Sequence, residues 1–208
     1  MPRETCVAIG YINMLTFTAS VQSLAVISVN RYVKICRPSW FVDIYTFRNV
    51  FFMCMGVWIF SGLLSVPPLM GWAAYSYLPT ASVCFCDWSV SFSYALFMIF
   101  ICFCVPCLVM CLCNVGILRA YFQSRKALLA FGDKQFQLSA SLLVVIVIFV
   151  ISWFPYCVSM FVSVFSPELS SRRLDVTSLF LGYSNSCVNP IVYGVMNKKF
   201  RSAYRGIF

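Results

Sequence analysis

The sequence contains no histidine, few acidic residues and little charge of either sign. Six of its 208 residues are Asp or Glu, none is His, and charged residues make up 10% of the chain. Histidine is the commonest metal ligand and a frequent acid–base group, and no pairing of a nucleophile with a base is visible. We therefore expect neither an enzyme nor a metal or other cofactor. Soluble domains carry about 25% charged residues, so the composition also excludes a soluble fold.

Long apolar stretches stand in place of the missing charge. Five runs lack Asp, Glu, Lys and Arg and exceed the ~20 residues that cross a bilayer. These runs are 5–30, 49–86, 88–118, 135–167 and 176–197. We predict an all-α integral membrane protein, one domain over 1–208, with five transmembrane helices at 7–35, 49–72, 90–122, 136–165 and 174–195. The chain has no repeated halves and no ionisable residue in mid-membrane, which argues against a transporter or channel.

The basic residues are divided unevenly between the two predicted sides of the membrane. Of the 15 Lys and Arg residues, only Arg3, Arg172 and Arg173 lie on the side that holds the N-terminus. Cytoplasmic loops are rich in Lys and Arg, so this predicts an extracellular N-terminus and a cytoplasmic C-terminus. The basic residues lie in separate loops, which favours anionic lipid over nucleic acid as a partner. Aromatic residues at every fourth position of 200–208 predict a short amphipathic helix on the inner leaflet.

Most of the twelve cysteines have no sign of a disulfide or zinc framework. Nine fall in or near predicted spans, where cysteine behaves as a small apolar residue. Cys6, Cys84 and Cys86 lie on the extracellular side, where oxidation is permitted. Three thiols allow one disulfide with one cysteine left over.

Charged, polar and helix-breaking residues punctuate the apolar spans, where they are costly and usually functional. They are Asn30-Arg31-Tyr32, Trp58, Pro106, Trp153-Phe154-Pro155 and Asn189-Pro190-Ile191-Val192-Tyr193. In this order, and with Cys6 at the outer end of the first span, they resemble class A (rhodopsin-like) G-protein-coupled receptors. The resemblance covers the third to seventh helices and the short eighth helix of that family.

The resemblance implies a role for each matching position. Arg31, between Asn30 and Tyr32, would bind a heterotrimeric G protein at the plasma membrane, and Trp153 would be the toggle above the Pro155 hinge. Val21, Pro106 and Phe149 would form a packed triad. Asn189, Pro190 and Tyr193 would form an inner polar network. Ser20, Asn185, Ser186 and Asn189 would belong to a sodium site. Cys6 would pair with Cys84, slightly favoured, or with Cys86.

The positions that match the family's ligand pocket are mostly apolar or aromatic. They are Asn13, Met14, Phe17, Met98, Cys102, Trp153, Tyr156, Cys157, Met160 and Tyr183. Asn13 replaces the amine-binding acid and Tyr183 replaces the retinal-binding Lys, so the resemblance implies a small neutral or lipophilic ligand. The tract 191–197 is most similar to melatonin receptors, with an opsin-like subgroup as the alternative. Pro68 stands where melatonin receptors have a ligand-binding Asn.

Several departures from the family pattern affect the expected activity. Asn30 and Gln135 replace the two acids that hold the arginine in the resting state, which predicts raised basal activity. Asn114 replaces a tyrosine that contacts the position of Tyr193. The first two helices of the family have no counterpart in these 208 residues. We expect either a piece of a longer receptor or a five-helix form that signals weakly or not at all. The alternative function is that of a truncated, non-signalling fragment that pairs with full-length receptors.

Overall fold

The structure of this chain is a computed structural model. It describes the backbone of residues 2–79, 82–123, 125–166, 169 and 171–196. The side chains of these residues are described except for 123–140, Asn189, Tyr193 and Met196. The predicted amphipathic helix at 200–208 lies outside the described residues.

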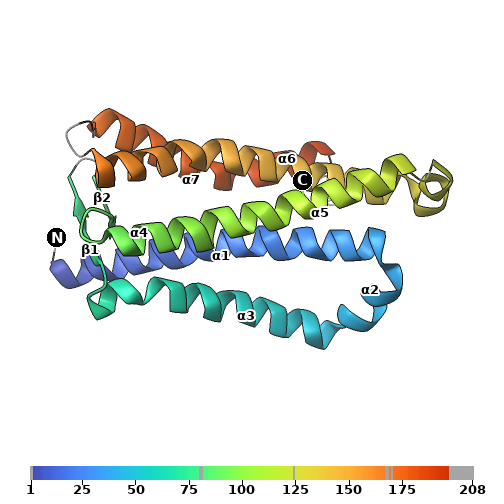
Figure 1. The fold of residues 1–208 in the computed structure, drawn as a ribbon, viewed down its shortest axis with the longest axis horizontal. Helices are drawn as coiled ribbons and strands as arrows, with labels where there is room; N and C mark the ends of the chain where they lie inside the picture. Colours follow the sequence, from blue (N-terminus) through green and yellow to red (C-terminus); the bar gives the residue numbers. More distant parts are fainter. Residues whose placement is uncertain (1, 80–81, 124, 167–168, 170, 197–208) are drawn as a thin grey trace, which may run out of the picture.

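The described chain is a bundle of long helices closed at one end by a two-stranded hairpin (Figure 1). The elements are α1 (Arg3–Cys36), α2 (Pro38–Ile44), α3 (Phe47–Ser65), η1 (Pro67–Met70), β1 (Ala74–Leu78), β2 (Val83–Asp87), α4 (Phe92–Ile99), η2 (Phe100–Cys104), α5 (Val105–Gln123), α6 (Arg125–Phe165) and α7 (Arg172–Met196). Helix α1 packs against both α3 and α5, and α6 packs along α7. The hairpin lies at the end that holds the N-terminus, and α2 lies at the opposite end.

The predicted helical membrane bundle is confirmed in its main features. Within the described residues, Arg3–Cys36, Phe47–Met70, Phe92–Phe122 and Ser141–Phe165 are long and apolar enough to cross a membrane. Helix α7 is not among these four, although it packs along α6 within the bundle. Its polar run Ser184-Asn185-Ser186 lowers its hydropathy, so its place as a fifth span rests on packing.

Several predicted boundaries are wrong, for reasons visible in the local sequence. Helix α6 begins at Arg125, not at 136, because the run 127–130 consists of Ala and Leu, the strongest helix formers. The predicted basic loop at 123–134 is therefore mostly helix. The α-helix of the span predicted to reach residue 72 ends at Ser65. Pro67 and Pro68 follow, and proline has no backbone N–H to continue the helical hydrogen bonds. Pro38 starts α2 inside a predicted loop.

A π-helical segment interrupts the predicted span 90–122. In η2 the Val105 N–H bonds to the Phe100 carbonyl, five residues back. In that register the Ile101 carbonyl would need the N–H of residue 106, which is proline and has none. The Gln22 side chain of α1 supplies a donor instead, with Nε2 3.4 Å from the Ile101 oxygen. Pro106 thus accounts for the break in this helix and for a polar contact across the bundle.

The connection between the predicted spans 49–72 and 90–122 contains an antiparallel hairpin. Tyr75 of β1 pairs with Cys86 of β2, and the Tyr75 hydroxyl donates to the Ser65 carbonyl at 2.7 Å. Gly10 of α1 lets the Tyr75 ring approach, because a Cβ there would lie 2.8 Å from a ring carbon. These contacts fix the hairpin to the outer ends of α1 and α3.

A disulfide also ties the hairpin to α1. It joins Cys6 to Cys84, with Cα atoms 5.3 Å apart. The alternative partner, Cys86, is a fully buried free thiol. Burial, and to a lesser extent the Asp87 carboxylate, raises the pKa of Cys86 above its usual range, so the thiol stays protonated and a poor nucleophile.

Candidate functional site

The indole of Trp153 is enclosed by aromatic rings from three helices. Its centroid lies 4.4 Å from Phe17 of α1, 6.3 Å from Phe149 and 5.9 Å from Tyr156 of α6, and 6.2 Å from Tyr183 of α7. A Cβ on Gly182 would come within 2.9 Å of the indole, so this glycine makes room for it. Pro155, which has no N–H to donate within the helix, follows two residues later inside α6. Trp153 therefore sits where a movement of the rings would reach the weakest point of α6.

A cavity of about 470 Å³ lies beside Trp153; we call it the Trp153 cavity. Four of the predicted ligand residues line it: Asn13, Phe17, Trp153 and Tyr183. Three of the predicted sodium-site residues line it as well: Ser20, Asn185 and Ser186. The cavity thus brings together positions that the sequence assigned to two different sites.

The other predicted ligand residues lie apart from this cavity. Met14, Met98, Cys102, Tyr156 and Met160 belong to the main buried core, together with hairpin residues. Cys157 is half-buried and lies in neither group. The predicted ligand set is therefore divided between an open cavity and a packed region under the hairpin.

Among the residues that line the Trp153 cavity, the only oxygen atoms that could bind a cation are uncharged. The Ser20 hydroxyl donates to its own helix, at the Thr16 carbonyl, 2.8 Å away. The Oδ1 atom of Asn185 is buried and has no hydrogen-bond partner among the described residues. No lining residue is an Asp or Glu, so these residues alone do not fit a sodium ion. Asn189, the fourth predicted member, has no described side chain.

The predicted packing triad lies in the interior. Val21, Pro106 and Phe149 are almost completely buried, on α1, α5 and α6 respectively. Val21 and Phe149 belong to the same buried cluster as Trp153. Phe149 also lines the Trp153 cavity, so this buried layer borders the cavity.

At the inner end of α1 the predicted switch residues have different partners. The Nε atom of Arg31 is buried without a hydrogen-bond partner among the described residues. Asn30 lies close to Tyr45, on the connection after α2. Burial raises the pKa of Tyr45, and the Asn30 amide partly offsets this effect. Because an amide carries no charge, Asn30 supplies no counter-charge for Arg31.

Two further contacts involve the inner half of α5. The Tyr32 ring packs on Gly116, where a Cβ would lie 2.5 Å from a ring carbon. Asn114 donates to its own helix, at the Met110 carbonyl, 2.7 Å away. Pro190 lies inside α7, while the side chains of Gln135 and Tyr193 lie outside the described set. In the family, a tyrosine at the position of Asn114 contacts the position of Tyr193. Here the Asn114 side chain bonds within α5 instead.

The hairpin makes polar contacts with two predicted ligand residues. The Asn13 amide donates to the Cys84 carbonyl at 3.2 Å. The indole N–H of Trp88 donates to the Tyr156 hydroxyl at 2.9 Å, in a buried position. Sequence reasoning missed Phe85 and Trp88 as site residues, because 68 positions separate Trp88 from Tyr156. The available signal was two aromatic residues flanking Cys86 on the extracellular side.

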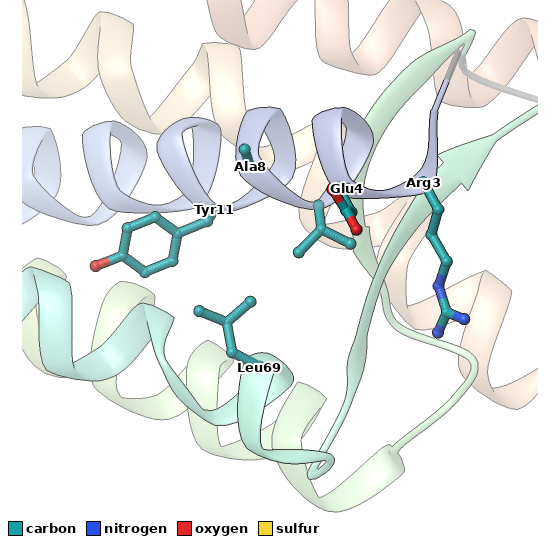
Figure 2. A pocket seen from close by; sticks show the side chains of 6 residues that line it. Arg3, Glu4, Ala8, Tyr11 and Leu69 are labelled. Carbon is teal, nitrogen blue, oxygen red and sulfur yellow. The ribbon is translucent and has the colours of Figure 1, made fainter.

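A second hollow, of about 510 Å³, lies at the outer end of α1 against η1. Figure 2 shows Tyr11 and Leu69 facing this hollow, with Arg3 and Glu4 at its end toward the N-terminus. Sequence reasoning missed it, because Leu69 reaches α1 only through the turn that follows Pro67 and Pro68. Its charged residues are exposed, and no candidate site residue lines it.

Known proteins resemble this chain in sequence and in fold. The family model of the 7 transmembrane receptor (rhodopsin family) matches residues 1–193. Melatonin receptor type 1B-B of Danio rerio is 29% identical over 208 residues, covering 96% of this chain and 60% of that receptor. The GQ-coupled rhodopsin of Mizuhopecten yessoensis is 27% identical over 218 residues, covering 95% of this chain and 44% of its own length. The chain therefore spans about half the length of these curated relatives.

A solved structure extends the likeness to the fold. The crystal structure of squid rhodopsin matches with a TM-score of 0.86 at 26% identity, over 95% of this chain and 62% of that one. The fold and the family are those of receptors and not of enzymes. Since the family model covers nearly all of the sequence, the chain belongs to the rhodopsin family of seven-transmembrane receptors.

Proposed function

We propose that this chain is the membrane core of a receptor that transmits an extracellular ligand signal to a heterotrimeric G protein. The observation that carries the proposal is the ring cluster around Trp153, which lines the Trp153 cavity two residues before Pro155 of α6. A ligand in this cavity would contact the indole directly. Because Pro155 removes a helix hydrogen bond, the inner half of α6 can swing when the indole moves.

The cytoplasmic end of the proposed pathway is Arg31. Its buried Nε has no partner among the described residues, so an incoming carbonyl would gain a charge-assisted hydrogen bond. Ligand binding and G-protein binding would both favour the state in which α6 has swung outward. Trp153, Pro155 and Arg31 would thus act as sensor, hinge and effector contact.

The proposed ligand is a small neutral or lipophilic molecule. The rings of Phe17, Trp153 and Tyr183 line the cavity, and Asn13 supplies an amide. Relatives named as a melatonin receptor and as a rhodopsin support the same ligand class. Tyr183 has no amine, so a retinal Schiff base is not part of the proposal.

A signalling assay tests this function. The receptor is expressed from its native transcript, and dissociation of Gα from Gβγ is followed while small lipophilic compounds are screened. We expect a response that Arg31→Ala abolishes and that Arg173→Ala, a charge removed from the outer end of α7, leaves intact. A response of equal size in the Arg31→Ala variant would contradict the proposal.

We propose a multi-pass plasma-membrane protein with its N-terminus outside. The Cys6–Cys84 disulfide supports this orientation, because such bonds persist in oxidising compartments. Antibody staining of a tag placed before Met1, in intact cells, is the expected result. Staining of that tag only after permeabilisation would reverse the orientation.

A second candidate function is pairing with another receptor without signalling. Polar residues of α1 and α7 line the Trp153 cavity, and the Asn185 oxygen has no hydrogen-bond partner among the described residues. Such a surface favours cover by another transmembrane helix. The upstream reading frame of the native transcript distinguishes the two candidates: two further spans favour signalling, and their absence favours pairing.

A further inference from the structure

The hollow at the outer end of α1 changes in chemistry along its length, and we call it the α1–η1 hollow. Its lining is charged at the end toward the N-terminus, at Arg3 and Glu4, and apolar or aromatic farther along α1 (Figure 2). The apolar part consists of Val7, Ala8, Tyr11 and, from η1, Leu69. Such a sequence of groups resembles the order of groups in a lipid, with a charged head followed by a hydrocarbon chain.

The length of α1 places this change of chemistry at the surface of the membrane. Its 34 residues extend over about 50 Å at 1.5 Å per residue. The hydrocarbon core is about 30 Å thick, and the bilayer with its headgroups about 40–45 Å. The first residues of α1 therefore reach the headgroup layer, on the side that we propose to be extracellular. Tyr11 lies about 12 Å farther along the helix than Arg3, at the edge of the acyl chains.

The two charged residues of the hollow have opposite signs, and both are exposed. Figure 2 shows that the side chains of Arg3 and Glu4 point in different directions rather than toward each other. A guanidinium forms charge-assisted hydrogen bonds with phosphate, and a carboxylate attracts an ammonium group. The pair therefore complements a headgroup that carries both charges, whereas Glu4 would repel a headgroup that is only anionic.

The walls of the apolar part are fixed by the hairpin and by η1. The Tyr11 ring meets the Tyr75 ring edge-on, with centroids 6.4 Å apart and planes at 89°. The Tyr75 hydroxyl is in turn bonded to the Ser65 carbonyl at the end of α3. On the other side Leu69 is 51% exposed. A wall that is already ordered costs little to bind against, so this surface favours an acyl chain.

We propose that the α1–η1 hollow binds one zwitterionic phospholipid of the outer leaflet. The Arg3 guanidinium binds the phosphate, and the Glu4 carboxylate lies against the ammonium group. One acyl chain packs against Val7, Tyr11 and Leu69. Anionic lipids are concentrated in the cytoplasmic leaflet, so a pair without net charge suits the leaflet that it faces. The inference concerns a site apart from the proposed ligand cavity and does not depend on G-protein signalling.

Native mass spectrometry tests this site with two lipids that differ only in the headgroup. The receptor made from its native transcript is titrated in detergent with palmitoyl-oleoyl phosphatidylcholine or with palmitoyl-oleoyl phosphatidylglycerol. We expect one phosphatidylcholine molecule to bind more tightly than phosphatidylglycerol. Arg3→Gln removes the phosphate contact and should weaken phosphatidylcholine binding about two- to fivefold, the range of exposed ion pairs.

Glu4→Gln tests the other charge of the pair. It removes both the attraction to ammonium and the repulsion of an anionic headgroup, so the preference for phosphatidylcholine should disappear or reverse. Arg173→Gln is the matched control, because Arg173 is an exposed arginine at the outer end of α7 and does not line the hollow. This variant should bind both lipids as the unchanged receptor does.

A third variant fills the hollow and leaves its charges in place. Ala8 is exposed and lines the hollow, so Ala8→Phe should prevent binding of either lipid. Binding of equal strength in Ala8→Phe would mean that the lipid lies elsewhere on the surface, and the proposal would be wrong. Equal affinity for the two lipids that neither Arg3→Gln nor Glu4→Gln changes would also overturn it. So would a receptor that binds neither lipid because a second copy or an upstream segment occupies the hollow.

Discussion

At the scale of single residues, one glycine determines how closely the toggle tryptophan packs. A Cβ on Gly182 would lie 2.9 Å from atoms of the Trp153 ring, whereas a Cβ on Gly194 in the same helix would meet nothing within 4 Å. The space around the indole is therefore set by α7 as much as by α6.

We predict that Gly182→Ala destabilises the protein by about 1–3 kcal/mol, the usual cost of overpacking a core. Gly194→Ala is the control, since it brings the same helix propensity into open space and should be neutral or slightly stabilising. Thermal unfolding in nanodiscs, followed by tryptophan fluorescence, measures both. Equal melting temperatures would show that the indole does not depend on this glycine.

A second residue-scale prediction concerns Asn30. Its side chain lies close to Tyr45 and carries no charge to offset Arg31. Asn30→Asp introduces a carboxylate next to Arg31 and should lower basal G-protein activation, because an opposite charge stabilises the resting position of the guanidinium. Asn49→Asp, at the exposed start of α3, adds the same charge elsewhere on the inner surface. Basal activation that is unchanged in Asn30→Asp would refute the weakened resting state.

Among single residues, candidate site positions were easiest to predict from the sequence where the residue type is rare in a membrane. Arg31, Pro155 and Trp153 stand out from apolar surroundings, so their positions could be predicted. The pairing of Trp88 with Tyr156 could not be predicted, because it depends on how far β2 reaches into the bundle. Nor could the sequence predict that the Asn185 oxygen has no hydrogen-bond partner among the described residues, because this depends on its neighbours in space.

At the scale of elements, charge-free runs predicted which segments are helical but not where the helices end. Such a run reports where lipid surrounds the chain, and a helix such as α6 can continue into water at Arg125. The hairpin escaped prediction because β1 and β2 are only five residues each. Their pairing depends on the disulfide and on contacts with α1 rather than on a strong alternating pattern.

The element-scale prediction is a coupling between Gln22 and Pro106. Gln22→Leu removes the donor to the Ile101 carbonyl and should cost about 1 kcal/mol or more, since that carbonyl is left unsatisfied. Pro106→Ala restores a backbone N–H that can serve the same carbonyl. In the Pro106→Ala background, Gln22→Leu should therefore cost much less.

A double-mutant cycle on chemical unfolding measures this coupling. Additive costs would mean that the Gln22 amide and the proline act independently, and that Gln22 does not replace the missing N–H of Pro106. A coupling of roughly 1 kcal/mol would support it.

At the scale of the whole molecule, polar side chains along α1 and α7 face outward beside the Trp153 cavity. Several of them bond to their own helix: Thr16 to the Ile12 carbonyl at 2.9 Å, and Ser184 to the Leu181 carbonyl at 2.7 Å. Their exposure to lipid therefore costs less than their polarity suggests, because the donors are satisfied within the helix. The Asn185 oxygen is different, since it is buried and has no partner among the described residues.

The last prediction uses this oxygen to ask whether the cavity is covered by another helix. In the 208-residue chain alone, Asn185→Leu should stabilise the fold by about 1–3 kcal/mol, because it removes an unsatisfied buried acceptor. Asn114→Leu is the control, since the Asn114 amide already bonds to the Met110 carbonyl and its loss should bring no gain. In the receptor made from the native transcript, a covering helix would give Asn185 a polar partner, and the same substitution should then destabilise by a similar amount. Thermal unfolding of both proteins measures the effect of Asn185→Leu. A higher melting temperature in both proteins would mean that no additional helix supplies a polar partner for Asn185. A lower melting temperature only in the native product would mean that such a helix supplies that partner.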